Sequence, residues 1–291
     1  MEISEKTRKI LLTMQEGEIT EYFIYQKIAS FVKDEKNCTI LKKIGEEERV
    51  HAEIWEKITG VKVKPNKLLI LFFTFLARVL GYTFALKLME KGEDGASALY
   101  DKISLEVPGA KKIAQDENRH EQQLLGMLDE ERLQYVGSMV LGLSDALVEL
   151  TGTLAGLTFA LQNNRLVALS GLITGISATL SMTSSEYLSA RSDGHPNPLK
   201  SSLYTGSVYL ITVVFLVLPY LLLPKDAFIP ALVILLSVVF VIIFLFTYYI
   251  SVAKDLPFGK RFAEMAGISI GVAAISFGIG LLVKHFLGIE I

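Results

Sequence analysis

The second half of this 291-residue chain contains several apolar runs that are long enough to cross a lipid bilayer. About 20 residues of α-helix, at ~1.5 Å per residue, span the ~30 Å hydrocarbon core of a membrane. Runs of this length and composition therefore favour membrane insertion. We predict five transmembrane helices, at about residues 136–161, 167–189, 203–223, 229–252 and 264–286.

Charge is distributed unevenly along the chain. Residues 1–135 contain 21 Lys or Arg and 23 Asp or Glu, whereas the remaining 156 residues contain 8 of each kind. The two parts therefore face different solvents, and we predict two domains, residues 1–130 and residues 131–291. The balanced charge, without a basic patch, argues against nucleic-acid binding. The single cysteine, Cys38, excludes an intramolecular disulfide and a rubredoxin-type iron site, which needs four thiolates.

The N-terminal sequence gives an expected orientation. It is charged and lacks the apolar region of a signal peptide, so the front domain is expected in the cytoplasm. The positive-inside rule agrees weakly with this orientation. The inside loops would contain Arg191, Lys200, Lys254, Lys260 and Arg261, and the outside segments Arg165, Lys225 and Lys284. Five crossings of the cell membrane would then place the C-terminus outside.

The front domain is expected to form four helices, at about residues 4–33, 36–59, 68–104 and 108–128, because apolar residues recur there at steps of three or four. Acidic and imidazole side chains interrupt these apolar stripes. In the second and fourth helices a glutamate stands three residues before a histidine, so that both lie on one helix face. The inward-facing polar residues are Glu18, Glu48, His51, Glu90, Glu93, Glu117 and His120.

Several carboxylates in an apolar core call for bound cations, because desolvating each charge costs on the order of several kcal/mol. Carboxylates with a few imidazoles suit divalent ions such as Fe(II) and Mn(II), and glutamates that can bridge favour a pair of ions. A single Glu-x-x-His on a charged helix is common. Here two of the chain's four histidines fall in that motif on inward stripes, which favours a metal site.

These residues resemble the ferritin-like superfamily, and the rubrerythrins in particular, over roughly residues 4–130. Di-iron bundles of this kind take one Glu from each of two helices and a Glu-x-x-His from each of the other two. The resemblance implies an all-α, ferritin-like four-helix bundle with a di-iron site, in which Mn or Zn could substitute for Fe. It also implies that Glu93 is a ligand beside Glu90, as in the Glu-x-x-Glu helix of rubrerythrins.

Residues 68–89, LLILFFTFLARVLGYTFALKLM, are as apolar as a spanning helix. A crossing there would place Glu90 and Glu93 on the opposite side of the membrane from the other predicted ligands. Arg78 would also cost ~2.5–3.5 kcal/mol at the bilayer centre. We therefore expect this segment to form the front half of the third helix, lying against the membrane surface or in a dimer interface.

Ionisable residues stand inside two of the predicted spans. Asp145 and Glu149 are four residues apart in the first, and Met182 and Glu186 are four apart in the second, so each pair shares a helix face. Acids inside a membrane are functional candidates, because charge there is costly. A thioether beside carboxylates suits a transition metal better than Mg(II) or Ca(II). The four residues therefore outline a path for a divalent transition-metal ion, with acids that can exchange protons for it.

The stretches GLSDALVE and ISATLSMTSSEYLSARS, followed by three more spans, resemble the vacuolar iron transporter family over about residues 133–288. The resemblance implies that Asp145, Met182 and Glu186 line an iron path between the subunits of a homodimer, and that Fe(II) is exchanged for protons. One departure is the short connection RSDGHPNPLKSS, where plant-type members insert a Glu-rich helical domain. The front bundle would substitute for that domain, and the fusion resembles the membrane-bound ferritin type of prokaryotic iron exporter.

The sequence thus predicts an exporter of cytoplasmic Fe(II), exchanged for protons, whose di-iron domain captures or senses iron. Whether that domain also oxidises iron stays open. One alternative is a membrane-tethered, rubrerythrin-like oxidase or peroxide reductase. Five spans and an acid such as Asp145 inside the bilayer argue against a simple anchor, and rubredoxin-type cysteines that would deliver electrons are missing. A second alternative, a Mn(II) exporter, shares every ligand.

Overall fold

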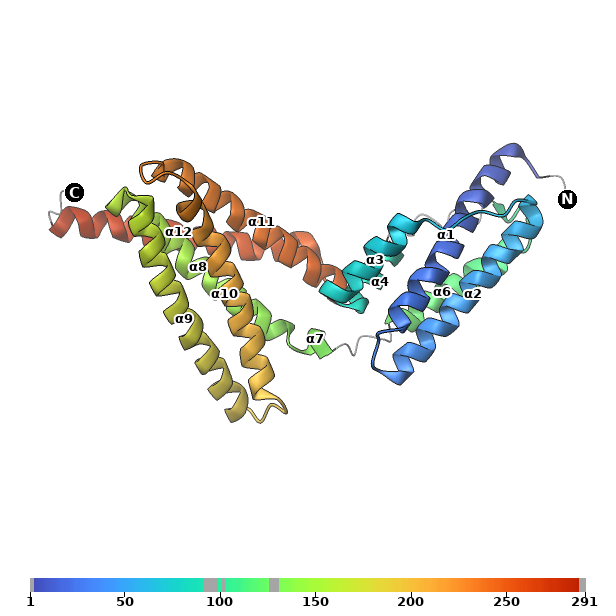
Figure 1. Ribbon diagram of the computed structural model, residues 1–291, viewed down its shortest axis with the longest axis horizontal. Coiled ribbons are helices and arrows are strands. Elements are labelled where there is room, and N and C mark those ends of the chain that lie inside the picture. Colours follow the sequence, from blue (N-terminus) through green and yellow to red (C-terminus); the bar gives the residue numbers. More distant parts are fainter. Residues whose placement is uncertain (1–2, 92–98, 101–102, 126–130, 288–291) are drawn as a thin grey trace. The chain divides into compact units, whose positions relative to one another are not determined.

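The computed structural model describes residues 3–91, 99–100, 103–125 and 131–287 (Figure 1). These residues form α-helices and contain no β-strand. The chain divides into two compact units, Met1–Leu133 and Gln134–Ile291. We describe each unit by itself.

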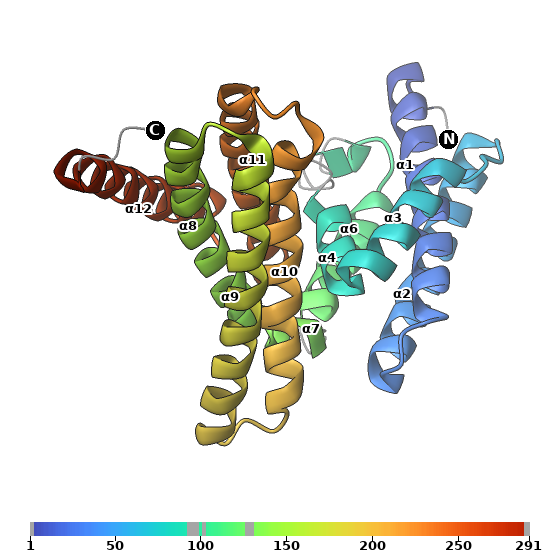
Figure 2. The same ribbon diagram turned by 60° about the vertical axis from the view of Figure 1, so that its left-hand side comes forward.

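The first unit is built on two long helices, α1 (Glu5–Ala29) and α2 (Glu35–Thr59), which lie side by side (Figures 1 and 2). The Ser4 hydroxyl caps α1 by accepting an amide of the first turn at 3.1 Å. The Asp34 carboxylate caps α2 in the same way at 2.7 Å. Both caps satisfy N–H groups that the start of a helix leaves open. The two helices lie where the sequence predicts them.

The third predicted helix is broken in two. α3 (Lys67–Leu80) begins after Asn66, whose side-chain oxygen accepts two amides of the first turn, and α4 (Tyr82–Lys91) follows. Gly81 separates them with φ 102°, a backbone conformation that a residue with a side chain disfavours. The expectation that residues 68–89 continue as the front half of one helix is therefore wrong. At 14 residues, α3 is also shorter than the ~20 residues that cross a bilayer.

The core of the first unit has two apolar clusters with a polar layer between them. One cluster includes Ile28 of α1 and Ile44 of α2, and the other includes Leu11 of α1 and Trp55 of α2. The stretches of α1 and α2 between these residues therefore pass through the polar layer. The fourth predicted helix, α6 (Ala110–Leu125), adds its own apolar residues to both clusters.

The second unit contains long apolar helices. Four of them are long and apolar enough to cross a membrane, and they coincide with four of the predicted spans. They are α8 (Val136–Leu161), α9 (Asn164–Ser192), α10 (Pro198–Leu222) and α11 (Phe228–Lys254). The fifth predicted span falls on α12 (Phe258–Leu287), many of whose side chains lie outside the described part of the chain, so this span stays a prediction. A short helix, α7 (Glu131–Gln134), precedes α8.

Helix α10 packs closely against α8 and α9 (Figure 2). A Cβ atom at Gly142 of α8 would collide with the carbonyl oxygen of Thr205 on α10. A Cβ atom at Gly206 of α10 would collide with the hydroxyl of Thr183 on α9. Glycine at these two positions lets the helix backbones approach, as small residues commonly do in membrane helices. The close contacts lie beside the predicted path residues of both spans.

Candidate metal centre and intramembrane acids

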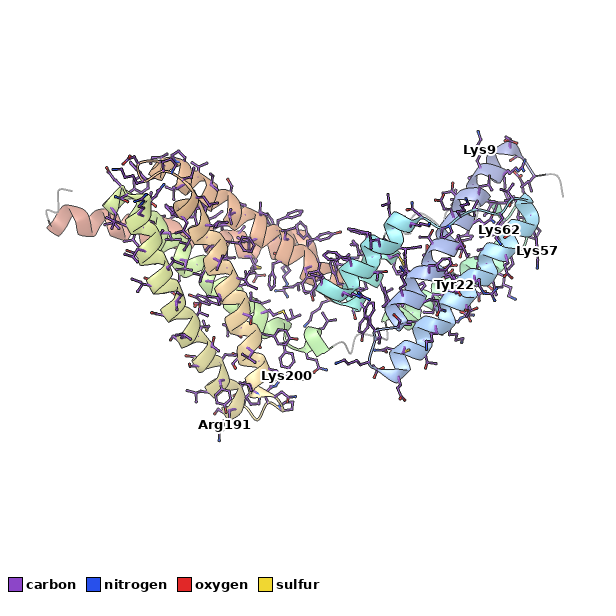
Figure 3. All side chains as sticks on the ribbon, viewed as in Figure 1. Lys9, Tyr22, Lys57, Lys62, Arg191 and Lys200 are labelled. Carbon is purple, nitrogen blue, oxygen red and sulfur yellow. The ribbon has the colours of Figure 1, made fainter. Side chains whose placement is uncertain are left out.

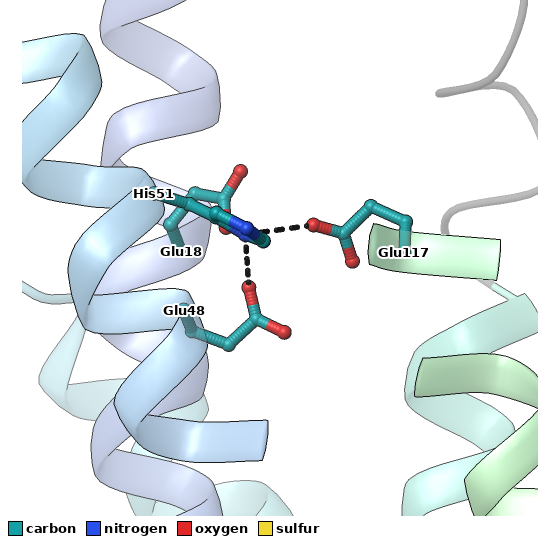
Figure 4. A group of neighbouring side chains, drawn as sticks. All are labelled: Glu18, Glu48, His51 and Glu117. Carbon is teal, nitrogen blue, oxygen red and sulfur yellow. Dashed lines mark hydrogen bonds and ion pairs between the residues drawn. The ribbon is translucent and has the colours of Figure 1, made fainter. Parts of the chain in front are cut away.

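Four side chains from three helices of the first unit converge in its polar layer (Figure 4). Glu18 comes from α1, Glu48 and His51 come from α2, and Glu117 comes from α6. One ligand atom from each lies within 4.8 Å of the others. His51 Nδ1 lies 3.4 Å from Glu18 Oε2, 3.3 Å from Glu48 Oε2 and 3.1 Å from Glu117 Oε1. This group of Glu and His side chains is able to hold a metal ion.

His120 adjoins the same group from α6. Its Nδ1 atom lies 2.8 Å from Glu48 Oε1 and 3.6 Å from Glu117 Oε2. The imidazole rings of His51 and His120 stack with their centroids 5.8 Å apart. The two Glu-x-x-His motifs therefore face each other, as their positions on inward stripes predict.

Three polar atoms of the group are buried and make no hydrogen bond: Glu18 Oε2, Glu117 Oε1 and His120 Nδ1. Each of them nevertheless lies within 4 Å of an atom of opposite charge in the group. The atoms converge without the angles that a hydrogen bond needs. Each unsatisfied buried polar atom costs about 1–3 kcal/mol, a cost that a bound cation would remove. Carboxylate and imidazole ligands together fit Fe, Mn or Zn.

In the metal-free centre, protons on the imidazoles balance the carboxylates. Burial opposes the charged form of His51, but close contacts with the carboxylates of Glu117, Glu18 and Glu48 outweigh it and raise the pKa of His51 to about 12. Burial opposes the charged form of His120 too, and Glu117 with Glu48 raises its pKa to about 10. A metal ion that binds here therefore has to replace protons.

The two most buried carboxylates respond in opposite directions. Burial raises the pKa of Glu48, but close contacts with the imidazoles of His120 and His51 outweigh burial and lower that pKa to about 2. Burial, and next to it the negative charge of Glu48, raises the pKa of Glu18 well above its ordinary value. Glu18 is thus the carboxylate that depends most on a further positive charge.

Two side chains from the apolar cluster around Trp55 orient Glu18. The Trp55 indole N–H donates to Glu18 Oε1 at 3.2 Å, and the Tyr100 hydroxyl donates to the same atom at 3.1 Å. Burial, followed by the charge of Glu18, raises the pKa of Tyr100, so its hydroxyl keeps its proton. With one Glu18 oxygen held in this way, the other is the atom left without a hydrogen bond.

The sequence analysis missed an outer set of charged residues. Glu47 Oε2 lies 2.6 Å from His120 Nε2, and Asp116 Oδ2 lies 3.5 Å from His51 Nε2. Arg119 contacts both acids, at 3.1 Å and 2.6 Å. A carboxylate on the second ring nitrogen orients a histidine that binds metal through the first. The position of Glu47 directly before Glu48, and of Asp116 before Glu117, is the only sequence signal for these contacts.

One predicted ligand from the third helix, Glu90, is not among the converging residues that the structure describes. Glu90 of α4 accepts a hydrogen bond from the Tyr25 hydroxyl at 3.1 Å. Glu93 lies outside the described residues. Of the seven predicted ligands, the structure therefore brings together Glu18, Glu48, His51, Glu117 and His120.

Hydroxyl groups hold two of the intramembrane acids of the second unit. Glu186 of α9 accepts hydrogen bonds from Ser138 of α8 at 3.0 Å and from Ser201 of α10. Glu149 of α8 accepts one from Tyr209 of α10 at 2.8 Å. The sequence analysis did not identify these hydroxyls, because their partners stand 15 to 60 residues away along the chain.

The other two predicted path residues, Asp145 of α8 and Met182 of α9, are half-buried in the single chain. Glu149 is exposed on it, although it lies in the middle of a candidate span. A carboxylate that faces hydrocarbon is costly, so this exposure calls for a polar or protein neighbour beyond the single chain.

Comparison with protein families gives one match. Residues 136–195 match the VIT family, a range that covers α8 and α9 with Asp145, Glu149, Met182 and Glu186. A search of curated proteins and a search of solved structures found no match. The match covers about a fifth of the chain, and together with the four candidate spans it indicates a membrane protein with a region similar to the VIT family.

Proposed function

We propose that this protein exports Fe(II) from the cytoplasm in exchange for protons, and that its first unit is a ferritin-like domain that captures or senses iron. One observation carries the proposal. A single chain contains a buried Glu/His cluster that is able to hold metal and, in helices that match the VIT family, four further residues suited to a transition-metal ion. Two sets of ligands for the same kind of ion are most simply used in succession.

In the first unit, the converging residues Glu18, Glu48, His51, Glu117 and His120 would hold the iron. Glu90 and Glu93 would complete a di-iron site of the rubrerythrin type. Bound iron would supply redox chemistry and a store of cations. The protein's own residues supply position: Trp55 and Tyr100 fix one oxygen of Glu18, and the outer carboxylates fix the two imidazoles.

In the second unit, Asp145, Glu149, Met182 and Glu186 would form the path of the transported ion. Each carboxylate would alternate between binding Fe(II) and binding a proton, so that protons entering along their gradient drive iron out. The hydroxyls on Glu149 and Glu186 support this role, because they orient a carboxylate without neutralising it. The exposure of Glu149 supports a homodimer in which a second copy covers it.

The experiment is Fe(II) flux in proteoliposomes that contain a pH-sensitive dye. The intact chain should move Fe(II) and protons in opposite directions, and Asp145→Asn should lose both movements. Asp226→Asn is the matched control, because Asp226 is an exposed acid in the connection between α10 and α11. Competition by Mn(II) in the same assay separates an iron from a manganese exporter. Absence of flux, with iron-dependent peroxide consumption instead, would show a tethered di-iron enzyme.

A further inference from the structure

Helix α3 is apolar on two sides. Its inward side packs Ile70 and Ala77 into the core, where they are 6% and 4% exposed. Its outward side leaves Leu68 79% exposed and Phe75 62% exposed. The outward stripe, spaced for one helix face, consists of Leu68, Leu71, Phe72 and Phe75. The outward stripe is the feature of the first unit that an aqueous environment does not explain.

The exposed side of α2 shows what a water-facing helix in this unit looks like. Its exposed residues are mostly charged and include Lys42, Lys43, Glu46 and Glu53. By contrast, six of the ten large exposed hydrophobic residues described in the first unit lie on α3 alone. Contiguous exposed apolar patches of this kind mark interaction sites with proteins or membranes.

The charged residues of α3 and of the segment that leads into it are all basic. Residues 57–89 contain no Asp or Glu. Lys62, Lys64 and Lys67 are exposed in the segment that leads into α3 and at its first residue (Figure 3, where Lys62 is labelled). A symmetric contact between two copies of this helix would bring like charges together, and α3 itself contains no acid to pair them. The surface of an anionic lipid bilayer complements both features, because its headgroups attract the lysines and its hydrocarbon accommodates the apolar stripe.

We propose that the outward stripe of α3 inserts into the interfacial layer of the bilayer, with Lys62, Lys64 and Lys67 on anionic lipid headgroups. Interfacial helices combine an apolar face with basic residues in this way. The chain itself keeps the bilayer close, because the first candidate span begins at Val136, directly after the first unit ends at Leu133. Such a short covalent link gives the lipid surface a high effective concentration, so modest affinity is enough.

Site-directed spin labelling of the full chain tests this proposal. Cys38→Ala removes the single cysteine, and labels then go onto Leu71→Cys, Phe75→Cys or the control Val50→Cys, which is 44% exposed on α2. The protein is placed in vesicles of phosphatidylcholine and phosphatidylglycerol. Accessibility to oxygen, which dissolves in lipid, is compared with accessibility to a water-soluble nickel chelate. We expect oxygen to dominate at positions 71 and 75, and the nickel chelate at position 50.

Two results would overturn the proposal. Nickel access at positions 71 and 75 equal to that at position 50 would show a hydrated face. Exclusion of both reagents, with a short label-to-label distance between copies, would show that a second copy covers α3. Unchanged Trp55 fluorescence in each labelled variant excludes a folding defect as the cause, because Trp55 is the only tryptophan and lies in the core of this unit.

A charge variant tests the role of the lysines. Lys64→Gln with Lys67→Gln should lower the ratio of lipid-embedded to hydrated label by about fivefold for each lysine. Lys42→Gln on the charged face of α2 should leave the ratio unchanged. If Lys64→Gln with Lys67→Gln leaves this ratio unchanged, the lysines do not contact headgroups.

Discussion

Both units of this protein keep carboxylates away from water, but they compensate the charge differently. In the first unit, Glu48 and Glu18 contact imidazoles that hold protons. In the second unit, the described partners of Glu149 and Glu186 are the hydroxyls of tyrosine and serine. An imidazolium neutralises a carboxylate, whereas a hydroxyl orients it and leaves its charge in place.

Under the proposed function, the difference matches what a resident ion and a transported ion require. A centre that keeps a metal is stable without it only if something else can balance its charge, and two histidines do so. A path has to bind an ion and release it, so its acids should accept Fe(II) or a proton with similar ease. The stability of the first unit is therefore expected to depend on its protonated histidines. The Fe(II) flux through the second unit is expected to depend on the carboxylates and on the hydroxyls that orient them.

The largest effect is expected from His51→Leu in metal-free protein. The substitution removes one partner of a buried charge pair and leaves Glu18 and Glu48 without it, which typically costs about 3–5 kcal/mol. Urea unfolding of the full chain, followed by the fluorescence of Trp55, measures the loss. His195→Leu is the control, because His195 is exposed in the connection between α9 and α10 and should change stability by less than about 0.5 kcal/mol. Equal stability of the two variants would break the comparison between the units.

The next largest effect concerns pH. Because the pKa values of His51 and His120 are raised to about 12 and about 10, both rings hold protons at pH 7 in the metal-free centre. Binding of Zn(II) should therefore release up to two protons from the imidazoles, and lowering the pH from 7 to 6 should weaken binding by about 10-fold for each proton released. Calorimetry in buffers of different ionisation enthalpy counts the protons. Binding without proton release would show that the imidazoles are not ligands.

Sequence reasoning finds the centre because burial and helix periodicity constrain it strongly. Burying an acid such as Glu18 among apolar side chains costs free energy, so its place on an apolar stripe predicts a polar layer in the core. Glu48 with His51 gives the same indication in a second helix. The candidate spans are predictable for a similar reason, since bilayer thickness sets their length. In each case the sequence of a single helix is enough to make the prediction.

What the sequence did not reveal depends on contacts between distant residues or on single backbone angles. The hydroxyls of Ser138, Ser201 and Tyr209 look like ordinary helix residues until packing brings them to their acids. Gly81 breaks the third helix through φ 102°, but glycine inside an apolar run is equally compatible with a continuous helix. Glu47 stands in a run of three acids, and only the fold shows that it reaches His120 Nε2.

A smaller effect is expected from Ser201→Ala. This change removes one hydroxyl from Glu186, a loss of about 1 kcal/mol of interaction. Fe(II) flux in proteoliposomes should fall by about fivefold while the stability of the first unit stays unchanged. Ser185→Ala, on the exposed side of α9, should keep full flux. Flux that survives Ser201→Ala undiminished would mean that Glu186 needs no fixed orientation, and the contrast between the units would then rest on Glu149 alone.

The smallest effect should come from Arg119→Ala, which removes a cation from the outside of the centre. Arg119 contacts Glu47 and Asp116, but its side chain is 46% exposed, and water and salt screen such pairs. Loss of stability under about 1 kcal/mol is expected in the same urea experiment. A loss as large as that of His51→Leu would mean that the buried acids are neutralised from the surface. In that case the first unit would balance its buried acids with the surface cation Arg119 rather than with buried imidazolium groups.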